Sequence, residues 1–291
     1  MAINTEITKQ ICDFVRIKPR NIQEIAFLIK KNWRTAERYV ERIEKETGCI
    51  ATRIFREGTR GALKIVYWNS VEEIHNTSFQ EVLFNKIMNR AHKADFSPFD
   101  IYQHVADSEK KAYIEDASRI GHDLNVSKEQ DLVGLLRSAS KQVFVFSGNL
   151  SWINARQGKV RVIEVIKELA KRKVSVKIIC RVSIVGVDNV KKLLAINEEV
   201  GREVIEIRHR YQPLRAMIID SRIVKLREIK DPAYYMQDEL KKKIKIFYDI
   251  YDRDWIEWLQ KIFWKMFSIG MPAEKRIGEI EKIQNMIVLL K

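Results

Sequence analysis

The sequence has few of the residues that interrupt or cross-link a fold: 11 glycines, 5 prolines and 3 cysteines among 291 residues. Few glycines and prolines beside abundant lysine, glutamate and isoleucine are typical of a thermophilic protein. The cysteines, Cys12, Cys49 and Cys180, lie far apart in the chain and lack CxxC spacing. We therefore expect buried thiols in a reducing cytoplasm and no zinc site or other metal site.

Long apolar runs are also missing. No stretch approaches the roughly twenty apolar residues of a membrane span, and the N-terminal segment MAINTEITKQ lacks the basic-then-apolar layout of an export signal. We expect a cytoplasmic protein without a membrane partner, and no pattern in the sequence requires a cofactor.

Positive charge is abundant: the formal net charge is +14 and the pI about 9.6. This balance suits a polyanionic partner, because phosphate contacts supply much of the affinity for nucleic acid. Anionic membrane surfaces and acidic proteins attract cations as well. A hydrophobic content of 46% supports real cores, and the length predicts two domains.

The stretch from Asn21 to Gly48 holds two short helical patterns separated by the turn Lys30–Asn32. Ile22, Ile25, Ala26 and Ile29 recur at helical spacing in the first pattern, and Trp33, Ala36, Val40 and Ile43 do so in the second. Gly48 is expected to end the second helix. Two helices joined in this way are a helix-turn-helix, whose second helix commonly lies in the DNA major groove.

The outward face of the second helix is charged. Arginine there can bind guanine edges or phosphate, and threonine can contact phosphate or a thymine methyl group. The candidate DNA contacts are Arg34, Thr35, Arg38, Arg42 and Lys45. An ordinary helical corner with a solvated charged face is an equally good interpretation of this stretch alone.

Two β-prone runs, Cys49–Phe55 and Ala62–Trp68, follow this corner and flank a loop with two glycines, which predicts a hairpin. The hairpin adds three candidate phosphate or minor-groove contacts: Arg53, Arg56 and Arg60. The stretch from about Thr5 to Trp68 resembles archaeal winged-helix transcription regulators. This resemblance favours double-stranded DNA as the partner.

We expect an α/β multidomain chain with a winged-helix domain at 1–70, a helical connector at 71–127 and an α/β domain at 128–291. The connector is expected to contain short helical pieces up to about Asn125. In the last domain, strand and helix patterns alternate from Gln142 to Leu226, which predicts a largely parallel sheet. An aromatic helix near Asp254–Phe267, with three tryptophans, is expected to lie in a core or a subunit interface.

This last domain, from about Lys128 to Phe267, resembles the phospholipase-D-like fold found in TrmB-type archaeal regulators. The pieces that carry the resemblance are the turn Ser147–Asn149, the helix-strand segment LAKRKVSVKIIC, and RHRYQPLRAMIID ending at Asp220. The family's signature is His-x-Lys-x4-Asp, in which histidine attacks phosphorus and lysine holds the phosphate oxygens. Here Pro213 and Arg215 stand at the histidine and lysine positions, and His209 lies out of register. The resemblance therefore implies a binder that is not an enzyme.

The candidate anion ligands in this domain are Ser147, Asn149, His209, Arg215 and Asp220, with Asp220 expected to orient Arg215. The family completes its site from two motif copies, so we expect a homodimer through this domain. The sequence thus predicts a dimeric, DNA-binding transcription regulator whose second domain binds a small anion. Two alternatives remain: a phospholipase-D-like nuclease or phosphodiesterase in which His209 rescues catalysis, and an adaptor that recruits a DNA-processing partner through its tryptophan-rich helix.

Overall fold

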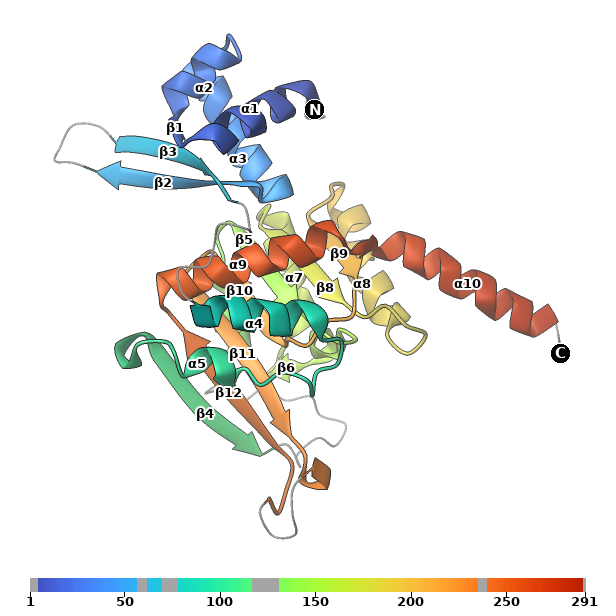
Figure 1. Ribbon diagram of the computed structural model, residues 1–291. Helices are drawn as coiled ribbons and strands as arrows, with labels where there is room; N and C mark the ends of the chain where they lie inside the picture. The colour runs from blue at the N-terminus through green and yellow to red at the C-terminus, as the bar shows by residue number, and fades with distance from the viewer. Residues whose placement is uncertain (1–4, 57–61, 70–77, 117–130, 235–239, 290–291) are drawn as a thin grey trace. The chain divides into compact units, whose positions relative to one another are not determined.

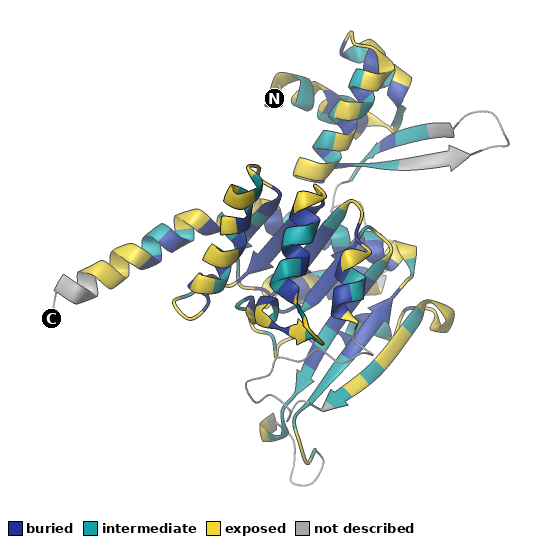
Figure 2. Cartoon of the chain, turned by 180° about the vertical axis from the view of Figure 1, so that it is seen from behind, coloured by how far each residue is buried: buried dark blue, intermediate teal, exposed yellow. Residues whose placement is uncertain are grey.

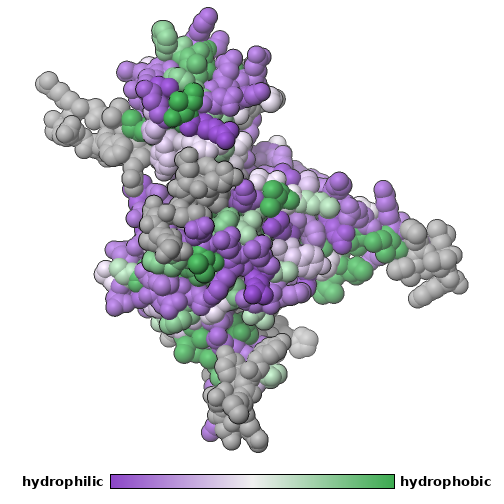
Figure 3. All heavy atoms as spheres, viewed as in Figure 1, coloured by the Kyte–Doolittle hydropathy of each residue, from purple (hydrophilic) through white to green (hydrophobic). Residues whose placement is uncertain are grey.

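The computed structural model describes residues 5–56, 62–69, 78–116, 131–234 and 240–289. The chain divides into two compact units, Met1–Asn76 and Thr77–Lys291, and each is described by itself (Figure 1). No helix in the described ranges is both long and apolar enough to cross a membrane. Hydrophilic residues cover most of the surface seen in Figure 3.

The first unit contains three helices and a small antiparallel sheet. The helices are α1 (Thr5–Ile17), α2 (Ile22–Leu28) and α3 (Trp33–Thr47), and the strands are β1 (Arg20–Asn21), β2 (Ile50–Arg56) and β3 (Ala62–Trp68). In the described part of this unit the strands have the order β1-β3-β2, and both pairings are antiparallel. The two short helices, their tight turn and the hairpin runs expected from the sequence are confirmed as elements.

Polar caps fix the ends of α2 and α3. The Asn21 side chain accepts a hydrogen bond from the Glu24 amide, and the Glu24 carboxylate accepts one from the Asn21 amide, both at 2.8 Å. This reciprocal pair satisfies two amides that a helix start leaves without partners. Asn32 caps α3 by accepting from the Thr35 amide. Gly48 ends α3 in the left-handed region, at φ 65°, as expected.

One residue of the expected apolar stripe is not in the core. Ala36, Val40 and Ile43 are fully buried, whereas the Trp33 side chain remains 54% exposed. Trp33 is the first residue of α3, and no further turn of helix covers it. The Arg34 guanidinium lies over its ring instead, 5.4 Å from the ring centroid.

The second unit is built on a large mixed sheet. Its helices are α4 (Ser78–Asn89), α5 (Phe99–Tyr102), α6 (Leu132–Arg137), α7 (Val162–Lys171), α8 (Val187–Val200), α9 (Arg253–Ser268) and α10 (Ala273–Leu289). Its strands are β4 (Lys110–Asp116), β5 (Gln142–Phe146), β8 (Ser175–Cys180), β9 (Ile205–His209), β10 (Ala216–Ile219), β11 (Ile223–Lys230), β12 (Ile244–Ile250) and β13 (Met271–Pro272). A separate short pair, β6 (Arg156–Gln157) and β7 (Val160–Arg161), completes the described strands.

The expectation of a largely parallel sheet is wrong. Within the described ranges the strand order is β13-β9-β8-β5-β10-β11-β12-β4. Only β5 with β8 and β8 with β9 run parallel, and every other pairing is antiparallel. The reason is that β10, β11 and β12 follow one another in hairpin order, whereas helices α7 and α8 connect β5, β8 and β9. Helical crossovers allow parallel neighbours, and hairpins do not.

Helices cover both faces of this sheet. Val143 and Val145 of β5 belong to the core cluster formed with α6, α7 and α8, which α10 also joins. The alternate residues, Phe144 and Phe146, point to the other face and contact Phe263 of α9. Phe144 stacks on its ring at 4.6 Å between centroids, and Phe146 meets it edge-on at 5.2 Å. Figure 2 shows the buried strands between helices whose outer faces are exposed. This alternation follows from the two-residue period of a strand.

Two further expectations are settled by this packing. The short helical pieces expected up to about Asn125 are wrong for Lys110–Asp116, which pairs with β12 as strand β4. The aromatic helix is confirmed as a core element, because Trp255, Trp258 and Trp264 of α9 are all buried. An adaptor that recruits a partner through these tryptophans therefore lacks its surface.

Candidate functional site

A cavity of about 560 Å³ lies at one edge of the large sheet. Parallel strands end at the same edge, and this cavity is bordered by the residues that follow β5, β8 and β9. The start of β10, part of β11 and the segment 91–94 after α4 complete the wall. Crevices at the carboxyl ends of parallel strands are a common place for ligands in α/β proteins.

The wall is strongly cationic. Among the described residues the lining includes one carboxylate, Asp231, and six cationic side chains: Lys93, Arg181, Arg210, Arg215, Arg227 and Lys243. Asp231 is already paired with Lys243 at 2.8 Å. The other five cations therefore have no carboxylate facing them from the described wall. An anionic ligand would supply the missing counter-charge.

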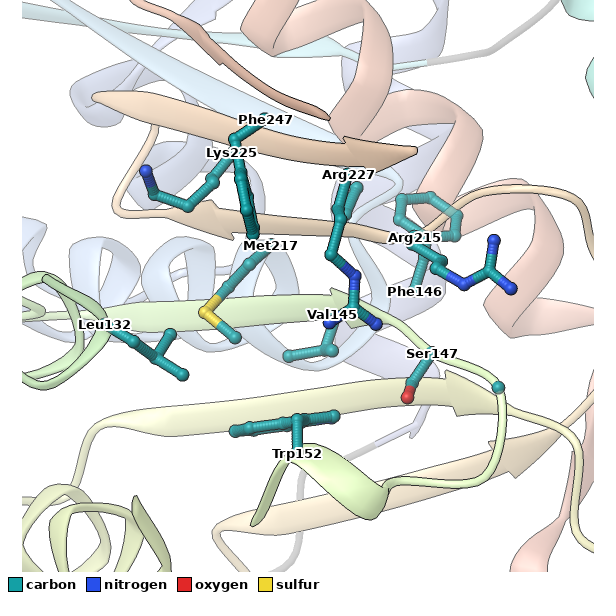
Figure 4. Close-up of a pocket in the computed structure, with 12 residues that line it drawn as sticks. Leu132, Val145, Phe146, Ser147, Trp152, Arg215, Met217, Lys225, Arg227 and Phe247 are labelled. Atoms are coloured by element: carbon teal, nitrogen blue, oxygen red, sulfur yellow. The ribbon is translucent and has the colours of Figure 1, made fainter. Parts of the chain in front are cut away.

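Arg215 and Arg227 lie next to one another in this wall. Arg215 immediately precedes β10, Arg227 lies in the neighbouring strand β11, and the Arg227 amide donates to the Arg215 carbonyl. Both also line a small recess of about 80 Å³ with Ser147 and Trp152. Figure 4 shows the two arginine side chains and Ser147 next to one another, beside the Trp152 ring. Neither guanidinium group donates a hydrogen bond to an acceptor among the described residues.

The electrostatic effect of this grouping is visible in the pKa values. Burial, followed by the charge of Arg227, lowers the pKa of Arg215 to about 10. Burial also lowers the pKa of Arg227. The pKa of Lys93 is lowered well below its usual value by burial, and then by the charge of Arg215. Its ammonium group donates to the Leu214 carbonyl, which is a neutral acceptor. Such shifts mark a place where positive charge is costly.

Buried cations elsewhere in the same sheet are compensated. Lys225 Nζ lies 2.7 Å from the Asp249 carboxylate, and Lys177 Nζ lies 2.6 Å from that of Glu206. Burying a charge without a partner costs several kcal/mol, so partners are the rule. The cavity cations depart from the pattern that this protein itself follows. This departure makes the cavity the candidate site of the second unit.

The structure brings three of the sequence candidates together: Ser147, Asn149 and Arg215 all line the cavity. Gln212 holds the surrounding loop in place. Its amide group donates to the Ser147 carbonyl at 3.0 Å, and its oxygen accepts from the Leu214 amide at 2.7 Å. The loop that carries Arg215 is thereby fixed to the end of β5.

Asp220 lies elsewhere, contrary to the expectation that it orients Arg215. The two residues flank opposite ends of β10, and Asp220 sits beside Gln142 at the start of β5. Its carboxylate accepts from the amides of Ser140, Lys141 and Gln142 at 2.5, 2.8 and 2.8 Å, and from the Ser140 hydroxyl. Asp220 and Ser221, at φ 48° and 56°, form the tight turn expected there. The aspartate is a structural cap.

His209 also lies outside the cavity wall. Its Nδ1 accepts from the Val182 amide at 2.9 Å, so that nitrogen is engaged. Burial, followed by the charge of Arg276 on α10, lowers the pKa of His209. Among the described residues, His92 is the histidine that lines the cavity, and it comes from the segment after α4. No spacing in the sequence points to His92, because it reaches the wall from a distant part of the chain.

The candidate DNA contacts of the first unit lie on α3. Arg34, Arg38 and Lys45 are exposed, Arg42 is half-buried and pairs with Glu46 at 2.6 Å, and the Thr35 amide belongs to the cap described above. The acidic residues of α3 have other partners: Lys64 of β3 lies 3.1 Å from Glu37 and 2.9 Å from Glu41. Arg60 and the side chains of Arg53 and Arg56 lie outside the described residues.

Comparisons with known proteins find likenesses of fold only. No protein-family model and no curated protein matches the sequence. Among solved structures, the chain is similar to the phospholipase D family member Nuc from Salmonella typhimurium, with 12% identity and a TM-score of 0.39 over 56% of this chain and 98% of that chain. NucT from Helicobacter pylori gives 17% identity and a TM-score of 0.37, over 56% and 99%.

The archaeal chromatin protein TrmBL2 aligns over more of the chain. The alignment covers 90% of this chain and 89% of that chain, with 11% identity and a TM-score of 0.33. These likenesses do not assign a family or an activity, so the chemistry of the described residues carries the argument.

The role of Asp220 as a cap leads to a stability prediction. Asp220→Asn keeps a residue type that tolerates positive φ but replaces one acceptor oxygen with a donor. We expect the free energy of unfolding at neutral pH to fall by about 2 kcal/mol, because three turn amides lose a charged, largely buried acceptor. Denaturant unfolding measures this loss. The exposed Asp188→Asn is the matched control and should change it by less than about 0.5 kcal/mol.

The loss should depend on pH. Burial acts to raise the pKa of the Asp220 carboxyl, but the amides of Gln142, Ser140 and Lys141 outweigh burial and lower it. A lowered folded-state pKa gives stability that is present above the unfolded value of about 3.9 and is lost as pH falls through the folded value. The difference between parent and Asp220→Asn should therefore shrink below about pH 4. A difference that stays constant into acid would contradict the role of the carboxylate.

Proposed function

We propose that this chain is a DNA-binding regulator with an anion-binding second unit. The observation that carries the second half is the cavity at the sheet edge, where the partly buried Arg215 and Arg227 belong to a wall whose described carboxylate is already paired. The first half rests on the exposed basic face of α3. Each half has its own experiment.

The first unit fits a winged helix. Helices α2 and α3 are the helix-turn-helix, and β2 with β3 is the wing. On α3, the partners of Glu37 and Glu41 come from β3, which reduces the negative charge that would repel phosphate. Arg34, Arg38 and Lys45 project within roughly 40° of one another on a helix of 3.6 residues per turn. A recognition helix uses such a stripe in the major groove.

The DNA prediction concerns the two arginines of this stripe. Arg34→Ala combined with Arg38→Ala should weaken binding by at least about tenfold at fixed salt, because a base-reading arginine contributes about 1–3 kcal/mol. The melting temperature should not change, because both side chains are exposed. Binding is measured by fluorescence anisotropy on DNA fragments that the parent enriches from a random pool.

The matched control removes the same charge from exposed positions of the second unit, Arg156→Ala with Arg202→Ala. If this control weakens binding as much as the α3 variant does, net charge rather than α3 carries the affinity. The α3 proposal then fails.

The anion prediction concerns Arg227 and Arg215. Arg227→Met should raise the free energy of unfolding without ligand by about 1–3 kcal/mol, because it removes a buried cation that faces other cations. The same variant and Arg215→Ala should each weaken binding of inorganic phosphate or pyrophosphate by about tenfold or more, since charge-assisted hydrogen bonds are lost. Calorimetric titration and denaturant unfolding give the two readouts.

Arg156→Ala is again the control, and it should leave both readouts unchanged. The absence of binding heat and of any phosphate-dependent stabilisation in the parent would contradict an anion site.

The second candidate function is phosphodiester cleavage, favoured by the presence of His92 in the cavity wall. Release of nitrophenol from bis(4-nitrophenyl) phosphate by the parent, and not by Arg215→Ala, would establish that activity in place of simple binding.

We also propose that two chains pair. Two linked DNA contacts gain affinity through effective concentration, and helix-turn-helix proteins commonly bind as dimers on two half-sites. If two chains pair at the anion site, as the sequence predicts, Asp220 takes no part in it, because this residue caps the far end of β10. Light scattering of the full chain at micromolar concentration should give twice the mass of one chain. A single-chain mass would contradict pairing.

A further inference from the structure

Two of the three cysteines lie in contact, and they are not the buried thiols expected from the sequence. Cys12 Sγ in α1 is 3.2 Å from Cys49 Sγ, although 37 positions separate the two residues in the chain. Both are free thiols and neither is fully buried. A disulfide bond is about 2.05 Å long, so a small side-chain movement of roughly 1 Å would close it.

The surroundings of the pair favour a reactive thiolate at Cys49. Cys12 can donate its S–H to Cys49 Sγ, and the Thr47 hydroxyl lies 2.9 Å from the same sulfur. The hydrogen bond from Cys12 is the main reason why the pKa of Cys49 is lowered to about 7, and the Thr47 hydroxyl adds to it against the opposing effect of burial. The pKa of Cys12 is raised by the same hydrogen bond, then by burial, with Asp13 as the adjacent charge.

Cys180 provides the contrast within the same chain. It is fully buried in strand β8, and burial raises the pKa of its thiol to about 12. A buried thiol of this kind reacts slowly, because the thiolate is the nucleophile. Cys180 therefore serves as an internal control for any reaction at the other two.

We propose that Cys12 and Cys49 are a redox modification site that forms an intramolecular disulfide on exposure to a hydroperoxide. The Cys49 thiolate attacks one peroxide oxygen, the O–O bond breaks, and hydroxide leaves to become water. Cys49 is then a sulfenic acid. Cys12 attacks its sulfur, the S–O bond breaks, and the departing hydroxide takes up the Cys12 proton. Two thiols and one hydrogen peroxide give one disulfide and two waters, with two electrons passing from sulfur to oxygen.

The bond would join two elements of the first unit. Cys12 lies in α1, and Cys49 follows Gly48, which ends α3, and precedes β2. A cross-link over 37 positions restricts the unfolded chain, which stabilises the folded unit. Oxidation would thus stiffen the junction between α1 and the end of α3. This inference does not depend on DNA binding.

The test uses the full chain and hydrogen peroxide. Thiol titration after denaturation should find one free thiol in place of three, and peptide mapping should recover Cys12 joined to Cys49 within one chain. The oxidised protein should melt higher by about 5 °C or more, and a reductant should reverse the shift. Cys180→Ala should still form the bond, whereas Cys12→Ala should not.

A second readout separates reactivity from mere proximity. Alkylation of Cys49 by iodoacetamide at pH 6 should be about tenfold slower in Cys12→Ala, because the thiolate loses its hydrogen-bond donor. An unchanged alkylation rate would overturn the reactive role of the pair. Three thiols remaining after peroxide treatment, or a bond that includes Cys180 or links two chains, would overturn the proposed site. Unfolding during the reaction would be recognised by the simultaneous loss of Cys180.

Discussion

Repulsion between cations at the edge of the large sheet is the constraint on which the second unit depends. Arg215 and Arg227 are placed by the register of β10 and β11, and Lys93 comes to the same wall from the segment after α4. Like charges in a partly buried place destabilise a fold unless packing elsewhere compensates. The aromatic layer of α9 on β5 and the apolar cluster on the opposite face provide that packing. Well-packed elements therefore surround the cavity, and its described wall carries an excess of positive charge.

The fold was predictable where a pattern is local. Helix caps, the turn at Asp220 and the strands around Ile178 could be read from short stretches, because capping and alternation act over a few residues. Whether neighbouring strands pair parallel or antiparallel could not be predicted in this way. Strand β12 alternates isoleucine with lysine only over its first three residues, Ile244–Ile246, and nothing local shows that it lies between β11 and β4. The mixed sheet is a property of chain connectivity.

The candidate site shows the same difference between residues in local motifs and residues that only the fold brings together. Ser147, Asn149 and Arg215 were found from the sequence, since each belongs to a short motif that ends or begins a strand. Asp220 belonged to the same motif, yet a four-residue strand separates it from Arg215 and the turn amides hold its carboxylate. Residues such as Arg181 and Arg227 were missed, because only the topology gathers the ends of β8, β5 and the middle of β11. The contact between Cys12 and Cys49 is likewise long-range.

Net charge alone does not distinguish the two cationic surfaces, but their burial does. Arg34 and Arg38 on α3 are exposed, so their attraction for an anion acts through water and is screened by salt within about 10 Å at 0.1 M. Arg215 and Arg227 are enclosed by protein, where the effective dielectric constant is lower and salt penetrates less. An extended polyanion suits the first surface, because many weak contacts add along its length. A small anion suits the second, because one compact charge can reach several donors at once.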